Sequence, residues 1–559
     1  MESSSDNANP KKRTPTSEYE EVNNFYKELY EQRQKAKKES QIHTILTTPN
    51  ESNSKQETGK KEEEANNQSQ ASVSNKISSE SNQTKTLSTP TPIPKESLEK
   101  HKKESLQKNF QANSSFPILP HINESRFLLN KLNCYPKDAY LEHMVSFREM
   151  LFEEMFTHTE KNQNKTLQSA FMTTFGFEVE LLKPIVQAGV KLTIANDYNR
   201  DSKYEPLIKN FEGYENFNLI SPPKNAHGVF YGVFHPKLWL LKFPNFLRVV
   251  IGSGNLTIED WSVWSNCLWH QDFQKKEEKF IKRKEKKERK NEQFDFDGNF
   301  KETLLDFIQN IMPKKIDFKN LTEIDIDEYE FEDIDVVLIS SVPGRYPINS
   351  EKKYGLARVK EIMSIFEKEN QKENRMLTYQ TTSLGSVDAN FISDFYYSFN
   401  SKPNKIMKII YPTEHYVVNE SYAGYEYAAP LCLMSKNFEK TSFVKECLYK
   451  FEGSEDYNFH HGILPHLKVC LLTNEKHEIN DSSVIYFGSH NCTSSAWGKY
   501  EKNKSQILVS NTELGILIPP GNGSAERLKK YMASGLPFKM PPNPYGKNDK
   551  PWIADKYKP

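Results

Sequence analysis

The sequence predicts an α/β fold of two similar halves related by a pseudo-twofold axis and preceded by a disordered N-terminal tail. Three observations lead to this prediction. A stretch at residues 233–261 is repeated at residues 466–497, apolar runs of strand and helix type alternate from Phe127 onward, and residues 1–115 contain few large apolar side chains. Apolar periodicity is the main sequence signal of secondary structure, and a repeated pattern indicates an internal duplication.

Residues 1–115 are rich in Ser, Asn, Gln, Lys, Glu and Thr. Such a segment cannot bury enough apolar surface to offset the entropy of an ordered chain, so we expect a disordered regulatory tail. Its basic cluster Pro10–Arg13 is typical of a nuclear import signal and equally of a solvated tail. Ser17 and Glu20 form a capping-box pattern ahead of apolar residues at helical spacing, which predicts an amphipathic helix that docks on a partner or forms only transiently.

The composition limits the classes of function. The 559 residues carry a formal net charge of zero, so the chain lacks the global positive field of proteins that coat DNA, and any nucleic-acid contact must be local. The six cysteines form no C-x-x-C pair, which argues against a zinc ribbon or a disulfide framework and for a reducing compartment. No apolar run is long enough to cross a bilayer and the first residues lack a signal-peptide core, so we expect a soluble intracellular protein without a membrane partner.

The repeated stretch carries the residues with chemical potential. Each copy contains H-x-K, then an apolar run of strand type, then the frame G-S-x-N-x-T-x-x-x-W. The corresponding residues are His235 and His466, Lys237 and Lys468, Gly252 and Gly488, Ser253 and Ser489, Asn255 and Asn491, Thr257 and Thr493, and Trp261 and Trp497. A single H-x-K is common by chance, and a histidine on an apolar strand is more often a core group than a catalyst. Repetition of the whole frame favours the functional interpretation.

The spacing predicts how these groups are presented. Residues two apart in a strand face the same side, so each H-x-K offers an imidazole beside an ammonium group. Asn255 and Asn491 each follow an apolar strand at a Gly-Ser turn, where a polar side chain projects from the strand end. Two such triplets facing each other would surround an anion with two imidazoles, two ammonium groups and two amides, which suits a phosphodiester.

These H-x-K…N pairs resemble the type I tyrosyl-DNA phosphodiesterase branch of the phospholipase D superfamily. The classical branch of that superfamily has H-x-K-x4-D, which would require Asp at the positions of Lys242 and Thr473. Further segments similar to the family are F-G-F-E-V-E-L-L (175–182), S-V-P-G-R-Y (341–346), T-T-S-L-G-S (381–386), I-I-Y-P-T (409–413), T-E-L-G-I-L (512–517) and P-Y-G-K-N-D-K-P-W (544–552). The resemblance covers residues 125–556.

The resemblance implies that each half is an α-β-α sandwich, and we place the halves at residues 116–347 and 348–559. The Pro343-Gly344 turn and Pro347 mark this boundary. A run rich in Lys and Arg at residues 275–290 interrupts the family pattern and is interpreted as an insertion in the first half. Charge patterns of this kind are typical of a solvated helix, although the net positive charge also suits contact with a phosphate backbone.

The resemblance also implies a mechanism that uses no metal and no cofactor. His235 would be the nucleophile on a 3′ DNA phosphodiester, and His466 would be the acid and then the base. Lys237, Lys468, Asn255 and Asn491 would stabilise the charge on the phosphate oxygens. Two further residues would orient the histidines: Glu513 matches one family position, and Asn266 stands where the family has Gln, with Gln271 as the alternative.

DNA contacts are implied by the same resemblance. Aromatic rings stack on bases, and hydroxyl and backbone N–H groups bind phosphates. The implied residues are Phe175, Tyr231, Thr382, Ser383, Leu384, Gly385, Ser386, Asn491, Cys492, Thr493, Ser494 and Ser495.

The implied substrate is single-stranded or double-stranded DNA whose 3′ end carries a topoisomerase I-derived peptide or another blocking group. This substrate predicts a DNA repair enzyme of the nucleus, and we expect a monomer whose tail recruits repair proteins. Three rival functions are a lipid-directed phosphodiesterase, a metal-dependent nuclease and a non-catalytic DNA-end binder. The first lacks a membrane segment and the motif Asp, the second lacks carboxylate clusters on the motif strands, and the third would be favoured by a broken triplet.

Overall fold

The computed structural model describes residues 127–132, 144–151, 167–200, 204–223, 232–276, 294–366, 375–385, 387–399, 407–440, 442–454, 461–521, 523–531 and 536–557. The predicted tail, Tyr231, Ser386 and residues 277–290 of the charged run lie outside these residues. Within them, no helix has both the length and the apolar character that a membrane span requires.

The first half is built on a sheet of eight strands in the order β2-β1-β8-β7-β6-β3-β4-β5. The strands are β1 (Phe127–Asn130), β2 (Met144–Val145), β3 (Ser169–Thr173), β4 (Lys191–Ala195), β5 (Phe217–Ile220), β6 (Leu238–Lys242), β7 (Phe246–Gly252) and β8 (Cys267–Gln274). Strands β3, β4 and β5 are parallel, whereas β6, β7, β8 and β1 continue the sheet in antiparallel pairs. The central strands are buried on both faces, which explains their continuous apolar runs.

The second half repeats this arrangement in a sheet of seven strands, ordered β15-β13-β11-β16-β17-β20-β9. The strands are β9 (Val337–Ser341), β11 (Arg375–Gln380), β13 (Lys408–Tyr411), β15 (Leu448–Lys450), β16 (Val469–Asn474), β17 (Val484–Gly488) and β20 (Glu513–Ile518). Strands β11, β13 and β15 are parallel and the others antiparallel, so β5-β4-β3-β6-β7-β8-β1 corresponds strand for strand to this order. The duplication seen in the motif therefore extends to the whole sheet, and the predicted fold class is confirmed.

The predicted boundary at residue 347 is too late. Strand β9 pairs with β20 and belongs to the second sheet, in the place that β1 occupies in the first. The Pro343-Gly344 turn leads from β9 into β10 (Gly344–Pro347), which pairs with β19 (Gln506–Val509) of the same half. The turn is thus a connection inside the second half, and the change of sheet falls before Val337.

Helices cover the sheets. They are α3 (Phe147–Leu151), α4 (Val179–Gln187), α5 (Tyr204–Lys209), α6 (Ile258–Ser262), α7 (Phe296–Ile311), α8 (Phe318–Thr322), α9 (Gly355–Phe366), α10 (Ala389–Ser398), α11 (Ser435–Glu439), α12 (Ser442–Cys447), α13 (Ser494–Trp497) and α14 (Ser524–Tyr531). Helices α4 and α8 contact β4, and α7 and α9 contact β9. The short strands β12 (Ser383–Leu384), β14 (Cys432–Leu433) and β18 (Lys499–Glu501) complete the fold.

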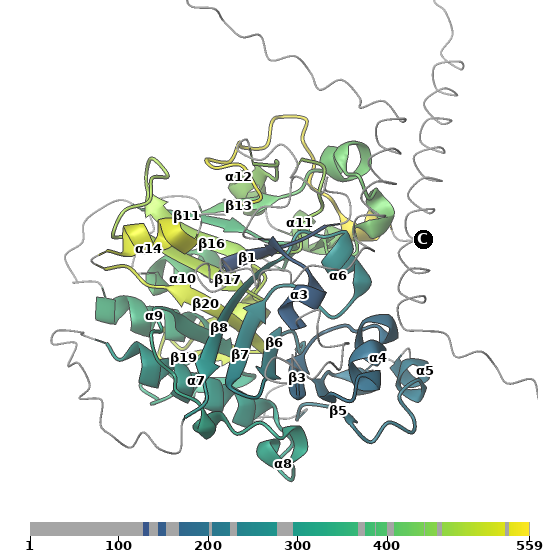
Figure 1. Ribbon diagram of the computed structural model, residues 1–559. Coiled ribbons are helices and arrows are strands. Elements are labelled where there is room, and N and C mark those ends of the chain that lie inside the picture. The colour runs from purple at the N-terminus through teal and green to yellow at the C-terminus, as the bar shows by residue number, and fades with distance from the viewer. Residues whose placement is uncertain are drawn as a thin grey trace, which may run out of the picture. The chain divides into compact units, whose positions relative to one another are not determined.

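The two sheets contact each other through the strands that follow the motifs. Strands β7 and β8, teal in Figure 1, lie beside the green and yellow β17 and β20. The rings of Phe127 and Phe487 meet across this contact edge to face, with centroids 4.8 Å apart. The shared core fixes the relative position of the strand ends that carry the two motifs.

A glycine at the start of α9 provides a test of this packing. Gly355 has a φ of +54°, and a Cβ atom added to it would lie 2.1 Å from the carbonyl oxygen of Trp497, the last residue of α13. Gly355→Ala should lower the free energy of unfolding by about 2–5 kcal/mol, because left-handed backbone strain and overpacking add.

The matched control is Gly189→Ala. Gly189 also has a positive φ, +83°, but an added Cβ would meet no atom within 4 Å. This variant should lose only about 1–2 kcal/mol of unfolding free energy, the backbone term alone. Equal losses in urea titrations of the two variants would contradict the packing described here.

Candidate active site

Each H-x-K segment lies immediately before a central strand and is held by the opposite half. Strand β6 begins at the residue after Lys237, and β16 begins at the residue after Lys468, so both motifs lie at strand entrances rather than inside strands. The backbone N–H of His235 donates to the carbonyl of Thr512 at 2.9 Å, and that of His466 donates to the carbonyl of Ser265 at 2.8 Å. The two motifs are therefore positioned by crossed backbone contacts between the halves.

The His235 ring is oriented by Glu513. Its Nδ1 lies 2.9 Å from Oε2 of Glu513 and 3.1 Å from the carbonyl oxygen of Ser489. Glu513 is in turn fixed by the hydroxyl of Ser489, which donates at 2.6 Å, and by the amide of Asn511, which donates at 3.1 Å. With Nδ1 engaged, Nε2 is the nitrogen of His235 that remains for a substrate.

The His466 ring is oriented by Asp260, a residue that the sequence interpretation did not single out. Its Nδ1 lies 2.5 Å from Oδ1 of Asp260, whose side chain is completely buried. Asn266 was expected to make this contact, but its Nδ2 donates to the carbonyl and to Oδ1 of Asp260 instead, at 2.8 and 3.2 Å. The Asn266 prediction is wrong. The side chain of Asn266 is too short to reach the His466 ring, and the carboxylate of Asp260 lies between the two.

The alternative, Gln271, also lies elsewhere, since its amide donates to the carbonyl of Glu332 at 2.8 Å. Carboxylates thus lie beside both histidines, although neither belongs to an H-x-K strand. The signal that could have revealed Asp260 is inside the repeated frame: N-L-T-I-E-D-W in the first copy stands against N-C-T-S-S-A-W in the second.

The two lysines are buried and share one electrostatic environment. Lys237 donates from Nζ to the carbonyl of His235 at 2.6 Å, and Lys468 makes the same contact with the carbonyl of His466. Burial lowers the pKa of Lys468 to about 7, and burial together with the charge of Lys468 lowers that of Lys237 well below its usual range. An anion bound between them would restore both positive charges, so the pair favours an anionic ligand.

The two motif asparagines differ in orientation. Oδ1 of Asn491 accepts from the hydroxyl of Thr382 at 3.1 Å and from the backbone N–H of Ser383 at 3.0 Å, which leaves its amide nitrogen for a ligand. Nδ2 of Asn255 instead donates to Asp260 at 3.0 Å, and its buried Oδ1 has no partner among the described residues. The two copies are therefore not chemically equivalent at this position.

Burial sets the charge state of the histidine–carboxylate pairs. Burial and Lys237 lower the pKa of His235, and burial and Lys468 lower that of His466 to about 3, whereas the carboxylates act in the opposite direction. Burial by itself raises the pKa of Glu513, but His235 more than compensates and brings it to about 2. His235 is thus held as a neutral imidazole, the form that can attack phosphorus.

The residues implied to contact DNA gather near this site. The Phe175 ring is 50% exposed and its centroid lies 5.7 Å from that of His235. Residues 382–385 lie beside residues 491–495, since Leu384 forms a backbone bridge with Cys492 and Gly385 faces Thr493. Leu384 and Cys492 are themselves buried in the core, and the backbone N–H of Cys492 already donates to the hydroxyl of Thr381 at 3.0 Å, so these two residues hold the segments in place and present no surface to a ligand.

Trp264 is a further aromatic neighbour that the sequence interpretation missed. Its ring meets that of His466 edge on, with centroids 5.7 Å apart, and its Nε1 donates to the carbonyl of Tyr427 at 2.9 Å.

No group of three or more His, Cys, Asp or Glu side chains in the described ranges is arranged to hold a metal ion.

Comparison with known proteins identifies the family. The family described as tyrosyl-DNA phosphodiesterase matches residues 126–546. Tyrosyl-DNA phosphodiesterase 1 of Arabidopsis thaliana is 26% identical over 386 residues, 58% of this chain and 60% of that protein. The Drosophila melanogaster protein of the same name is 25% identical over 354 residues, 57% of each chain. The matched part of this chain therefore spans about 60% of the length of these relatives.

A solved structure supports the fold. The crystal structure of the yeast tyrosyl-DNA phosphodiesterase superposes with a TM-score of 0.52 at 14% identity and covers 77% of this chain and 99% of the yeast chain. Because the family match extends over most of the sequence and includes both motif copies, the chain belongs to the tyrosyl-DNA phosphodiesterase family.

Proposed function

We propose that this protein hydrolyses the phosphodiester bond between the 3′ end of DNA and a tyrosine left by topoisomerase I. The observation that carries the proposal is the pairing of two histidines, one from each half, that are each held at Nδ1 by a carboxylate beside two buried lysines. Each histidine also lies within electrostatic reach of the other copy's lysine. The proposal requires that one phosphate meet all four groups.

In the first step, Nε2 of His235 attacks the phosphorus and the bond from phosphorus to the tyrosine oxygen breaks. The anionic phosphate bound between the lysines favours protonated His466, which gives its Nε2 proton to the departing phenolate. Tyrosine therefore leaves neutral, and DNA is attached to His235 through a P–N bond. Lys237 and Lys468 stabilise the negative charge on the equatorial oxygens, with the free amide of Asn491.

In the second step, His466 is the base. It accepts a proton from a water molecule that attacks the phosphorus on the side the tyrosine left, and the P–N bond breaks. His235 returns to its starting state and the product is a 3′ phosphate. The same histidine serves as acid and then base because the second step reverses the geometry of the first.

The wider proposals follow from the surroundings of the site. The exposed Phe175 ring suits base stacking, and the hydroxyl-rich segments 382–385 and 491–495 suit phosphate contacts of single-stranded or double-stranded DNA. We propose that other blocked 3′ ends are also processed. The basic cluster Pro10–Arg13 supports a nuclear repair protein. We further propose that the enzyme is a monomer whose tail binds repair proteins.

The first prediction concerns metal dependence. The protein should release tyrosine from a 3′-phosphotyrosyl oligonucleotide in excess EDTA at the rate seen without EDTA, because two lysines supply the positive charge. His235→Ala is the control and should release none. Cleavage that EDTA abolishes would support the metal-dependent nuclease, and binding of the oligonucleotide without cleavage would support the DNA-end binder.

The second prediction assigns the two histidines. With a 3′-nitrophenyl phosphate oligonucleotide, whose leaving group needs little protonation, His466→Asn should form the covalent intermediate but hydrolyse it slowly. DNA-bound protein should therefore accumulate on denaturing gels, and the bond should be labile in acid and stable in alkali, as a phosphoramidate is. Accumulation on His235→Ala instead would reverse the assignment.

A further inference from the structure

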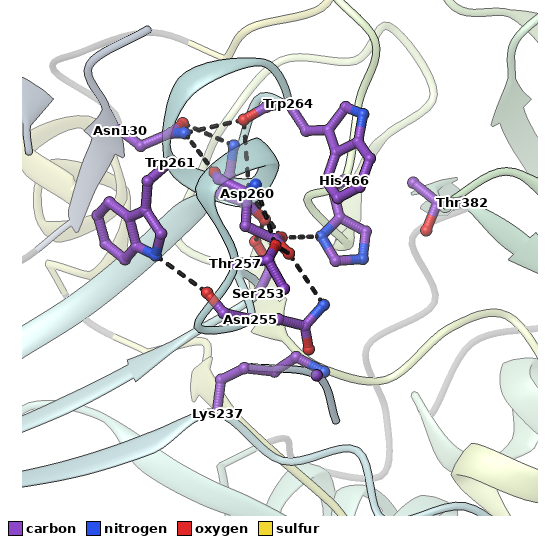
Figure 2. A network of polar contacts seen from close by, with 12 residues as sticks. Asn130, Lys237, Ser253, Asn255, Thr257, Asp260, Trp261, Trp264, Thr382 and His466 are labelled. Carbon is purple, nitrogen blue, oxygen red and sulfur yellow. Dashed lines mark hydrogen bonds and ion pairs between the residues drawn. The ribbon is translucent and has the colours of Figure 1, made fainter. Parts of the chain in front are cut away.

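Resting on the function proposed above, we propose that Asp260 is the positioning residue of the acid–base histidine, and that the two halves supply their carboxylates from different places in the repeat. The sequence interpretation assigned no carboxylate between the two H-x-K segments to the site. Figure 2 shows Asp260 at the centre of a buried polar network, with His466 on one side and Asn255 on another.

Every hydrogen-bonding side of this carboxylate is used. Oδ1 contacts Nδ1 of His466 and accepts from Asn266, while Oδ2 accepts from the amide of Asn255 at 3.0 Å and from the hydroxyl of Thr257 at 2.8 Å. A carboxylate held by four neighbours cannot rotate freely. Asp260 therefore fixes the angle of the His466 ring rather than merely balancing its charge.

Comparison of the two halves shows that the carboxylate of the first half occupies a different position from the carboxylate of the second. The strand-like bridges Phe234–Thr512 and Ser265–Pro465 are equivalent in the two halves, so the next residues, Glu513 and Asn266, occupy equivalent positions. Each also accepts from the serine of its own G-S turn, Ser489 at 2.6 Å and Ser253 at 2.8 Å.

In the short helices after the motif asparagines, the first half has the carboxylate and the second half lacks it. Asp260 lies in α6, capped by Thr257, and Ala496 lies at the same position of α13, capped by Thr493. The second copy thus pairs an alanine with a long carboxylate at residue 513, and the first pairs a carboxylate at residue 260 with a short amide. Each half keeps one carboxylate for the histidine of the other half.

The position of Asp260 couples two functions. Towards His466 it favours the imidazolium ion against Lys468 and Lys237, the other charged groups that face this ring. Towards Asn255 it holds the amide nitrogen, so that the oxygen is on the side of Lys237, as Figure 2 shows. Loss of the carboxylate should therefore disturb proton transfer more than the binding of DNA.

The test is Asp260→Asn, assayed on the 3′-phosphotyrosyl oligonucleotide beside the wild type. We expect kcat to fall roughly 10- to 1,000-fold while KM changes little. Asp260 raises the proton affinity of His466, and the first step needs protonated His466 in the complex with the anionic substrate, so the alkaline limb of the kcat profile should move to lower pH by about one unit. The nitrophenyl substrate should show accumulated DNA-bound protein, since the base of the second step is weakened.

Asp272→Asn is the matched control. Asp272 is a mostly buried carboxylate of the same half that receives two hydrogen bonds from Arg248, at 2.7 and 2.8 Å, at the end of β8 away from the site. This variant should keep the wild-type kcat and pH profile. A pH profile for Asp260→Asn that matches this control would overturn the proposal.

A double variant that moves the carboxylate to the other position separates a loss of positioning from a folding defect. The double variant Asp260→Ala, Asn266→Glu gives the first half the arrangement of the second, and it should be at least about tenfold faster than Asp260→Ala alone. Equal rates for these two variants would overturn the proposal. If the wild type itself releases no tyrosine, the proposed function fails instead, so the two failures are distinguishable.

Discussion

The crossed contacts between the two halves are the constraint on which the site depends. The N–H of His235 is held by Thr512 and the N–H of His466 by Ser265, so each histidine is positioned by the opposite half as well as by the strand that follows it. The orienting carboxylates are crossed in the same way, since Glu513 contacts His235 and Asp260 contacts His466. A site of this kind exists only when the sheets dock, which explains why their interface is a continuous apolar core.

The charges of the site are balanced within a small buried volume. With an anion bound, Lys237 and Lys468 carry the positive charges, and Asp260 and Glu513 carry the negative ones, all with almost no exposed surface. Removing charged groups from water is costly, and partners recover this cost only with good geometry. The dense hydrogen bonding around both carboxylates is consistent with that requirement, and a bound phosphate anion would shift the balance towards protonated lysines and a protonated His466.

Much of this account could be predicted from the sequence. The repeated H-x-K and G-S-x-N-x-T-x-x-x-W frames identified both motif copies and the duplication, because residue types and their spacing can be read directly from the sequence. The boundary before Val337 could not be predicted, since a Pro-Gly turn looks the same between two halves and inside one. The burial of Leu384 and Cys492 was also hidden, because their neighbours in the chain are small and polar.

Asp260 shows most clearly where sequence reasoning stops. The family resemblance leads to Asn266, which the structure places at the position equivalent to Glu513, but side-chain length decides which group reaches the ring. Asn266 is shorter than glutamate, and a carboxylate from the neighbouring helix takes the contact. That Asp260 rather than Asn266 contacts the ring becomes visible only when the distances are known.

The most direct test of the central claim, that two crossed histidines act on one phosphorus, is a crystal structure of the protein with orthovanadate and a 3′-hydroxyl oligonucleotide. Vanadate adopts the five-coordinate geometry of a phosphoryl transition state, which an enzyme binds more tightly than its substrate. We predict vanadium bonded to Nε2 of His235, with Nε2 of His466 within hydrogen-bonding distance of the opposite apical oxygen and both lysines on the equatorial oxygens. Vanadium bonded to His466, or bound away from either histidine, would contradict the account.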